Sequence, residues 1–223
     1  MDNSILFSLR LSLQVALAAT VLMVFFGVTT AYFLAVKKFK GSDFLDIFLT
    51  LPLVLPPTVT GYYLIIIFGR NGLVGSILYR LTGWSIMFTW YAAVLASFVV
   101  SVPLLIKTAR AAIESVDKNI ISASYALGLS EFQTAVCIVL PLARKGIIAG
   151  IILAFTRALG EFGATLMIAG NIPGKTNTVP LAIYACASNG DWSKANLMVA
   201  ALTVLSGVAL YLANRYSRGT FIR

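Results

Sequence analysis

The sequence predicts an all-α integral membrane protein of about five transmembrane helices, with the N-terminus outside and the C-terminus in the cytoplasm. Apolar residues make up 59% of its 223 residues and charged residues only 11%, less than half of the roughly 25% found in soluble domains. The apolar residues form long runs without charge, as in helices that cross a ~30 Å hydrocarbon core. The positive charges cluster beside alternate runs, which sets the orientation.

Composition also excludes several kinds of catalyst. The chain has no histidine, so it cannot supply an imidazole general base, a Ser-His-Asp triad or a His-ligated zinc or haem. Its net charge of +9 is explained by membrane topology, so no nucleic acid is expected as a partner. We expect no enzymatic activity of the chain itself and no cofactor.

The first expected span covers residues 11–36, between Arg10 and Lys37. A cleaved signal peptide has an apolar core of only about 7–15 residues after a basic segment. Here the apolar run is longer, and the basic cluster follows it. The span is therefore expected to stay in the mature protein as a membrane anchor.

The second expected span, residues 47–69, contains the sequence LPLVLPPTVTGYYL with Pro52, Pro56 and Pro57. Each proline removes a helix hydrogen bond, and a membrane tolerates the freed carbonyls only where protein, hydroxyl groups or water satisfy them. The helix should therefore be kinked or broken near its middle. Two interpretations remain open: a kink that only serves packing, or a helix that lines a polar path with Thr58 and Thr60.

The third expected span covers residues 85–106 and contains Pro103, for which a simple kink is expected. The fourth covers residues 146–169, and the fifth covers residues 195–214. A further apolar run, residues 132–143, is too short to cross the bilayer. We expect it to be interfacial or buried in protein.

Arg157 and Glu161, in the fourth span, are the only charges expected inside the membrane. An arginine near the bilayer centre costs about 2.5–3.5 kcal/mol on insertion scales, so it should face protein or water. The i, i+4 spacing lets the two side chains meet on one face of a helix. They form either a structural ion pair or the border of an anion path, since the guanidinium fork suits an oxyanion.

Orientation follows from the Lys and Arg residues of the short loops. With the N-terminus outside, eleven basic residues lie in the cytoplasm and five lie outside. The cytoplasmic set is Lys37, Lys38, Lys40, Lys107, Arg110, Lys118, Arg144, Lys145, Arg215, Arg218 and Arg223; the outer set is Arg10, Arg70, Arg80, Lys175 and Lys194. Cys137 and Cys186 then lie near opposite faces of the membrane, and we expect them to be unpaired and inert.

The segment at residues 170–176 reads GNIPGKT, which is one residue short of a phosphate-binding P-loop. It lacks the strand and the helix that flank a P-loop, and the predicted topology places it outside the cell. We therefore expect an ordered outer loop and no ATP site.

The largest cytoplasmic loop, residues 107–145, is expected to contain two short helices. Asp117 caps the first helix, which ends at Gly128, and Ser130 with Gln133 forms a capping box that opens the second, toward Pro141. Two short helices joined at a glycine form a docking element for a cytoplasmic partner. The alternative is an amphipathic pair that lies idle on the lipid surface.

Three segments resemble the permease subunit of bacterial molybdate ABC importers: LPLVLPPTVTGYYL, ASYALGLSEFQTAVCIVLPLARKGI and RALGEFGATLMIAGNIPGKTNTVPLAIY. The resemblance extends from the first span to about residue 185. It implies that the 107–145 loop couples the chain to an ATPase subunit. The matching positions are Ala123, Leu127, Gly128, Leu140 and Pro141.

The loop departs from the family pattern in its Glu-Ala-Ala core. Ala123 and Ser124 stand at the alanine positions, and no glutamate stands before them. Any contact that the family makes through that carboxylate is therefore absent from this chain. The resemblance implies a coupling role only through the shape of the loop.

The resemblance also implies how the chain assembles and where. Residues 1–223 would form a single transmembrane domain in the bacterial cell membrane, and two copies would enclose a path on their two-fold axis. An external solute-binding protein would deliver the oxyanion, and two cytoplasmic ATPase subunits would drive the cycle. The expected residues of the path or gate are Pro56, Pro57, Thr58, Thr60, Arg157 and Glu161.

Alternatives remain for the substrate and for the class of transporter. Tungstate, sulfate and thiosulfate are tetrahedral dianions that backbone N–H groups and hydroxyls serve as well as molybdate. From a different class, the chain would be a secondary transporter or channel that acts alone. Such transporters tend to show internal repeats and several polar sites at the midplane, whereas this sequence shows no repeat and one intramembrane ion pair.

Overall fold

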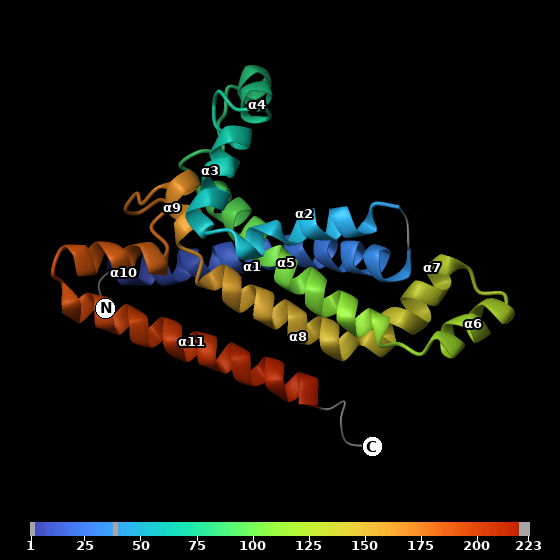
Figure 1. The fold of residues 1–223 in the computed structure, drawn as a ribbon. Coiled ribbons are helices and arrows are strands. Elements are labelled where there is room, and N and C mark those ends of the chain that lie inside the picture. The colour runs from blue at the N-terminus through green and yellow to red at the C-terminus, as the bar shows by residue number, and fades with distance from the viewer. Residues whose placement is uncertain (1–2, 38–39, 219–223) are drawn as a thin grey trace.

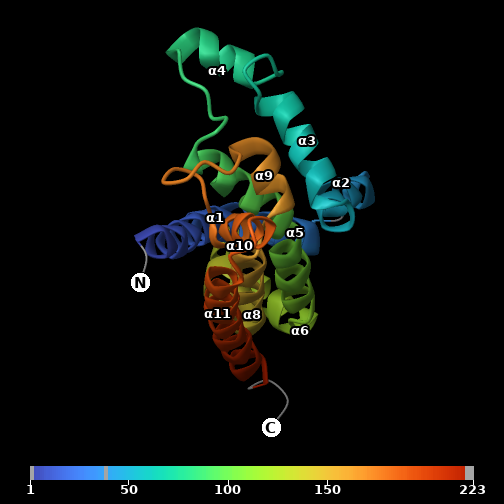
Figure 2. The ribbon, with the colours of Figure 1, turned by 90° about the vertical axis from the view of Figure 1, so that its left-hand side faces the viewer.

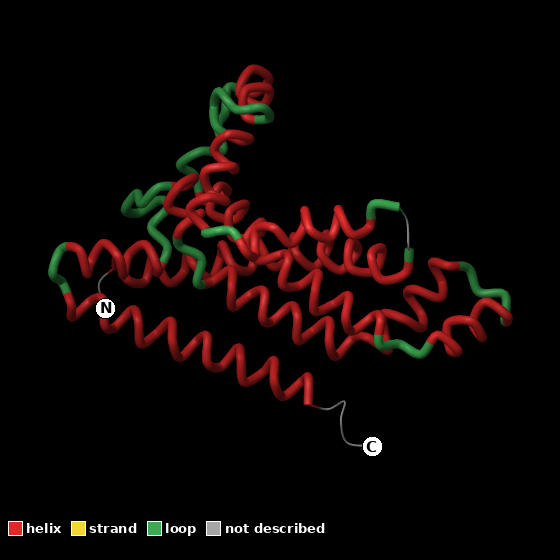
Figure 3. Tube along the Cα trace, in the orientation of Figure 1, coloured by secondary structure: helices red, strands yellow, loops and turns green. Residues whose placement is uncertain are grey.

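The computed structural model describes residues 3–37 and 40–218, and this described part is helical, with no strand (Figures 1 and 3). Within it, four helical stretches are long and apolar enough to cross a membrane: α1 (Asn3–Val36), α5 (Trp90–Glu114), the stretch Glu131–Leu159 and α11 (Trp192–Arg218). A fifth span results if α2 (Ser42–Val54) and α3 (Pro57–Phe68) count as one broken helix. The prediction of an all-α membrane protein with about five spans is confirmed.

Helix α5 forms the centre of the bundle and packs mainly against α1 and α8 (Leu140–Leu159). Its buried face carries small side chains: Ala92, Ala96, Ser97 and Ser101 are each at most 1% exposed. Small side chains let helix backbones approach closely, which is how helices commonly associate in lipid. The remaining long helix, α11, packs on α8 and on α10 (Val179–Ser188).

The second predicted span is broken at its prolines. Helix α2 ends at Val54, and α3 begins at Pro57, the helical position where a missing N–H costs least. Pro56 lies between them with an extended ψ of 135°, whereas Pro52 lies inside α2 and does not end it. The predicted break is confirmed. It turns the chain by 116°, so that α3 leaves the bundle sideways (Figures 1 and 2).

The stretch before the fourth predicted span differs from the expectation. Helix α7 (Glu131–Thr134), the π-helical turn η1 (Ala135–Val139) and α8 are continuous, so the apolar run at residues 132–143 begins a long helix and is not a separate short segment. Pro141 accounts for the π turn, because it has no N–H to give to the carbonyl of Cys137. The N–H of Leu140 instead reaches the carbonyl of Ala135, five residues back.

The end of the fourth predicted span also differs, because residues 146–169 are not one helix. Helix α8 ends at Leu159, and a separate short helix, α9 (Gly163–Ala169), follows after three residues. Gly160 is the C-cap of α8, and the carboxylate of Glu161 accepts a hydrogen bond from the N–H of Ala164 in the first turn of α9. The sequence indicated the apolar run but not this break within it.

Short helices lie at both ends of the bundle. Helix α10 lies at one end, and α6 (Lys118–Ala126) and α7 lie at the other (Figure 1). Helix α4 (Gly75–Thr82) continues the arm that α3 begins and projects away from the bundle (Figures 1 and 2). Helices α4 and α10 were not predicted, since neither follows from a charge-free run long enough to stand out.

The ends of the long helices shift from the predicted bounds. Helix α1 begins eight residues earlier than expected, and α5 begins at Trp90, where the hydroxyl of Thr89 accepts from the N–H of Ala92. Asp191 caps α11: its carboxylate accepts from the N–H of Lys194, and this bond and the nearby ammonium lower the pKa of Asp191. Lys38 and Arg223, two of the basic residues used for orientation, lie outside the described residues.

Candidate functional site

Helices α3 and α9 pack closely, which brings the second and fourth sequence segments together. A Cβ added to Gly61 of α3 would lie 2.7 Å from the Cβ of Met167 and 2.9 Å from the Cα of Ala164 in α9. In the other direction, a Cβ on Gly163 would lie 3.0 Å from the Cβ of Pro57. Each helix therefore needs a glycine at the contact. We call this contact the α3–α9 junction.

The ion pair between Arg157 and Glu161 lies at the same junction, at the end of α8. Nη1 of Arg157 donates to Oε2 of Glu161 at 2.7 Å, and Oε1 of Glu161 accepts from the N–H of Ala164 at 2.9 Å. The Glu161 side chain is 1% exposed and that of Arg157 is 33% exposed. Both carboxylate oxygens are thus used inside the protein, while the Arg157 side chain stays partly exposed.

The proline and threonine residues of the broken span do not all face the same way. Pro57 and Thr58 contact Gly163, two residues beyond Glu161, and Thr58 is exposed. Pro56 is the N-cap of α3, and its carbonyl accepts from Val59. These three residues therefore lie at the α3–α9 junction or next to it.

Thr60 lies apart from that group. It lines an apolar cavity of about 580 Å³ whose other walls come from α1, α2 and α5. Its side chain is 4% exposed, and within the described part of the chain its hydroxyl has no hydrogen-bond partner. The structure thus separates Thr60 from Pro57 and Thr58, although the sequence pattern grouped them.

The first helix predicted in the 107–145 loop forms as α6 and ends before Gly128, whereas the second, α7, continues through the π turn into α8. Asp117 caps α6 through the N–H of Asn119 at 2.8 Å, and Gly128 has a left-handed φ of +83°. The capping box is present: the hydroxyl of Ser130 accepts from the N–H of Gln133, and the Gln133 side chain accepts from the N–H of Ser130. We call α6 and α7, with the turn between them, the α6–α7 tip.

Buried hydroxyls hold the α6–α7 tip together, and apolar side chains cover its outside. The hydroxyls of Ser124 and Thr134 lie 3.0 Å apart, and both residues are buried. Leu127 is 83% exposed and Phe132 is 76% exposed. Ala123 is also exposed. The tip therefore presents an apolar surface, and the buried contact between Ser124 and Thr134 lies beneath it. The sequence indicated the two helices but not the contact between Ser124 and Thr134.

The other two coupling-loop residues lie behind the tip. Leu140 is partly buried and Pro141 is exposed at the start of α8, directly after the π turn. They shape the connection between the tip and the membrane helix. At the tip itself, Lys37 at the end of α1 reaches Glu131 at 3.4 Å, which ties the tip to the bundle.

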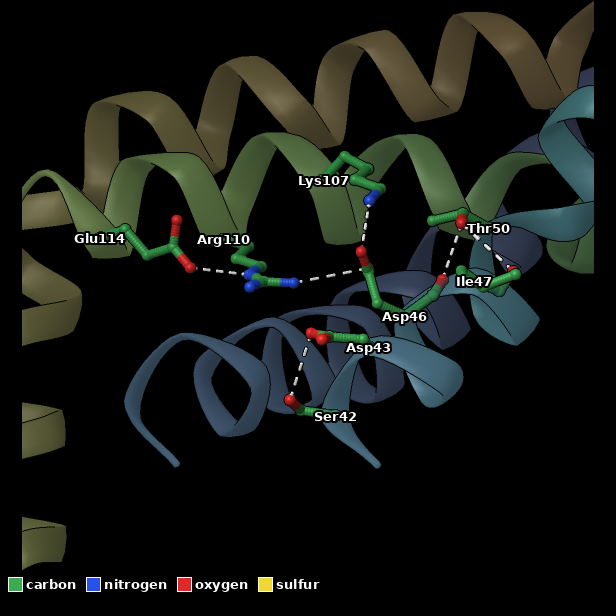
Figure 4. A network of polar contacts seen from close by, with 8 residues as sticks. All are labelled: Ser42, Asp43, Asp46, Ile47, Thr50, Lys107, Arg110 and Glu114. Atoms are coloured by element: carbon green, nitrogen blue, oxygen red, sulfur yellow. Dashed lines mark hydrogen bonds and ion pairs between the residues drawn. The ribbon is translucent and has the colours of Figure 1, made fainter. Parts of the chain in front are cut away.

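A second charged cluster joins α2 to α5 (Figure 4), near the end of α5 that leads into the α6–α7 tip. Asp46 of α2 contacts Lys107 at 2.7 Å and Arg110 at 3.5 Å, and Arg110 also donates to Glu114 at 2.7 Å. The sequence placed these residues on the cytoplasmic side but gave no sign that they meet, because they lie 61 positions or more apart along the chain.

The loop at residues 170–178 is ordered by its own polar side chains, as predicted, while its location outside the cell stays a prediction. The buried hydroxyl of Thr176 donates to the carbonyl of Gly170 and accepts from the N–H of Ile172. Asn177 donates to Asn171 and accepts from Ser8 of α1. The residues that resemble a P-loop thus form hydrogen bonds within the loop, and Asn177 anchors the loop to α1.

Comparison with known proteins agrees with this architecture. The model of a family described as "Binding-protein-dependent transport system inner membrane component" matches residues 23–219. The molybdenum transport system permease protein ModB of Escherichia coli (strain K12) is 40% identical, with 93% of this chain and 91% of that protein covered. ModB of Haemophilus influenzae is 38% identical, with 95% of this chain and 93% of that protein covered.

Solved structures show the same fold at low sequence identity. The structure of a bacterial ABC transporter involved in the import of the polysaccharide alginate superimposes with a TM-score of 0.77 at 13% identity, covering 100% of this chain and 82% of that chain. The MetNI methionine ABC transporter gives 0.72 at 17% identity, covering 98% and 99%. The chain thus belongs to the family of binding-protein-dependent transport system inner membrane components, the membrane permease subunits of ABC transporters.

Proposed function

We propose that the chain is the permease subunit of an ATP-driven molybdate importer in the bacterial cell membrane. Two copies would enclose the path on their common axis, with the N-termini outside and the C-termini in the cytoplasm. The substrate is supported by relatives that are about 40% identical over most of their length and are named for molybdenum transport. The path is supported by the α3–α9 junction, where two interrupted membrane segments meet beside a partly exposed arginine.

Interrupted helices suit a substrate path for a physical reason. A continuous helix uses its backbone groups internally, whereas the ends of broken helices leave N–H and carbonyl groups for ions or water. Helices α3 and α9 both begin at such breaks, and Pro57 and Thr58 lie against Gly163 there. A tetrahedral dianion passing this junction would meet hydroxyl and backbone N–H groups.

Arg157 suits transient contact with an anion better than tight binding. One of its nitrogen atoms donates to Glu161, so the carboxylate partly balances the positive charge. The rest of the guanidinium, on a side chain that is 33% exposed, can donate to an oxyanion. A site on a transport path must attract the substrate but bind it weakly enough to release it. An arginine whose positive charge is partly balanced by a carboxylate meets both requirements.

The energy would come from cytoplasmic ATPase subunits that bind the α6–α7 tip. Leu127 and Phe132 give this tip an exposed apolar surface of the kind that a protein groove covers. The buried contact between Ser124 and Thr134 joins α6 to α7, and α7 continues into α8, so a movement of the tip would be carried into α8. The exposed ion pair from Lys37 to Glu131 adds only a weak link to the end of α1.

The test is molybdate uptake into proteoliposomes that contain the chain with its ATPase subunits, with the solute-binding protein added outside. Uptake should require ATP and all three components, and tungstate and sulfate added in excess should show which related dianions compete. The chain reconstituted alone should move no molybdate. Uptake without the ATPase would overturn the importer assignment in favour of a transporter that acts alone.

A further inference from the structure

The cluster around Asp46 joins the broken span to the helix that leads into the α6–α7 tip. Asp46 lies in the first half of α2, and Lys107, Arg110 and Glu114 lie in the last two turns of α5 (Figure 4). Glu114 is the last residue of α5, and Asp117, the N-cap of α6, follows three residues later. A movement of the tip therefore reaches Glu114 through a very short connection.

The contacts within the cluster are unequal. Oδ2 of Asp46 accepts a hydrogen bond from Nζ of Lys107 at 2.7 Å, whereas its Oδ1 faces Nη1 of Arg110 at 3.5 Å without a hydrogen bond from the described residues. Arg110 instead donates through Nε to Glu114 at 2.7 Å. Two carboxylates thus share one guanidinium, and the one nearer the tip holds the hydrogen bond.

Helix α2 depends on α5 for its position. Helix α5 is its main packing neighbour, and no residue of α2 is fully buried within the described structure. A helix with so little packed surface is easily displaced, and a charged contact with α5 then fixes where it lies. Asp46 is the residue that supplies this contact, since its side chain is only 20% exposed and points to α5 (Figure 4).

We infer that Asp46 is a positioning residue for transport: its contacts with Lys107 and Arg110 make α2, and through the proline break α3, follow the movement of α5 and the α6–α7 tip. Arg110 is the shared element, because a change at the tip that releases Glu114 frees the guanidinium for Oδ1 of Asp46. The inference rests on the proposed function, since it assigns a role in coupling ATP hydrolysis to the path.

The test compares molybdate imported per ATP hydrolysed in proteoliposomes that hold the whole transporter. Asp46→Asn should assemble with the ATPase and hydrolyse ATP, but the ratio should fall by between about twofold and thirtyfold, the range known for residues that carry coupling without touching a ligand. Asp46→Glu should restore most of the ratio, because it keeps the charge and reaches the same two cations.

Asp43 offers the matched control. It lies in the same helix, one turn from Asp46, and its carboxylate contacts only the neighbouring Ser42 at 3.4 Å among the side chains of Figure 4. The charge of Asp43 acts on Arg110 more weakly than that of Asp46, so Asp43→Asn removes the same charge but should lower the ratio far less than Asp46→Asn does. Lys107→Gln removes the same contact from the α5 side and should also lower the ratio. The double variant with Asp46→Asn should have nearly the same ratio as Asp46→Asn alone, because both changes remove one interaction.

The outcomes separate the inference from the proposed function. An Asp46→Asn transporter with an unchanged ratio would overturn the inference alone, and so would an equal fall in Asp43→Asn. If neither Asp46→Asn nor Lys107→Gln assembles, the contact serves folding and the inference is wrong. A wild-type complex that imports no molybdate would overturn the proposed function, and the inference with it.

Discussion

At the scale of single residues, we propose that Arg157 and Glu161 divide the two roles that the sequence left open for them. Glu161 is almost fully buried and uses both oxygens to hold Arg157 and the first turn of α9. Its contacts are those of a structural residue. The Arg157 side chain remains 33% exposed, which fits the proposed role toward the substrate.

The first prediction contrasts the two members of this pair. Glu161→Ala should lower the free energy of unfolding by about 1–3 kcal/mol, less than for a fully buried pair because Arg157 is partly exposed. Arg157→Gln keeps a donor for Glu161, so the complex should assemble while uptake falls. Thermal unfolding in detergent and uptake in proteoliposomes check the two halves. Normal uptake by an intact Arg157→Gln complex would remove Arg157 from the path.

The second prediction concerns Gly128, whose φ of +83° is unfavourable for residues with a Cβ although open space surrounds the position. Gly128→Val should strain the turn by about 1–2 kcal/mol and weaken copurification of the ATPase, with membrane insertion intact. Gly128→Asn should bind the ATPase nearly normally, because asparagine tolerates this conformation. Equal behaviour of the two variants would show that the turn does not position the docking surface.

At the scale of elements, the sequence predicts features that depend on local chemistry and misses those that depend on contacts far along the chain. The break at Pro56 and Pro57, the Asp117 cap and the Ser130 capping box were predictable, because each depends on neighbouring residues. The break between α8 and α9 was not, since Glu161 there was interpreted only as a partner of Arg157.

Contacts between segments that lie far apart along the chain explain the other features that the sequence did not predict. The α3–α9 junction depends on Gly61 and Gly163, and nothing in either segment alone indicates that they meet. Thr60 was grouped with Thr58 on sequence spacing, but two residues along α3 correspond to about 200° around the helix, so Thr60 faces the apolar cavity while Thr58 lies at the α3–α9 junction. The sequence thus indicated which segments carry the candidate residues, but the direction in which each side chain faces depended on packing.

The third prediction tests the α3–α9 junction as a unit. Gly61→Ala should cost about 1–3 kcal/mol, because the new methyl group would overlap backbone and side-chain atoms of α9. Gly207→Ala in α11 is the control: no atom lies within 4 Å of its added Cβ. It should be neutral or slightly stabilising. Thermal unfolding of the purified variants measures both, and equal stability would show that the helices do not meet as described.

At the scale of the whole molecule, the bundle separates two ends to which we assign different functions. The outer loop anchored by Asn177 and helix α10 lies at one end, and the α6–α7 tip and the Asp46 cluster lie at the other (Figures 1 and 4). Between them, the small side chains of α5 hold α1 and α8 closely. This arrangement suits a subunit that receives solute at one end and energy at the other.

The fourth prediction concerns which side of the membrane each end of the bundle faces. In a chain whose Cys137 and Cys186 are replaced by serine, Lys175→Cys should react with a membrane-impermeant maleimide added to intact cells. Lys118→Cys should react only after the membrane is opened, because it lies in α6 at the opposite end. Both positions are exposed, so access depends on the side of the membrane. The reverse pattern would invert the topology deduced from the basic loops.

The fifth prediction tests most directly the central claim that the α3–α9 junction is the gated path. Thr58→Cys, in the same cysteine-free chain and in the complete transporter, is measured for its rate of modification by a charged thiol reagent. The rate should change between the resting and the ATP-trapped complex and should fall when molybdate is present. Leu81→Cys on the exposed arm helix α4 should react alike in all states. A Thr58→Cys rate that is indifferent to both ATP and molybdate would contradict the account.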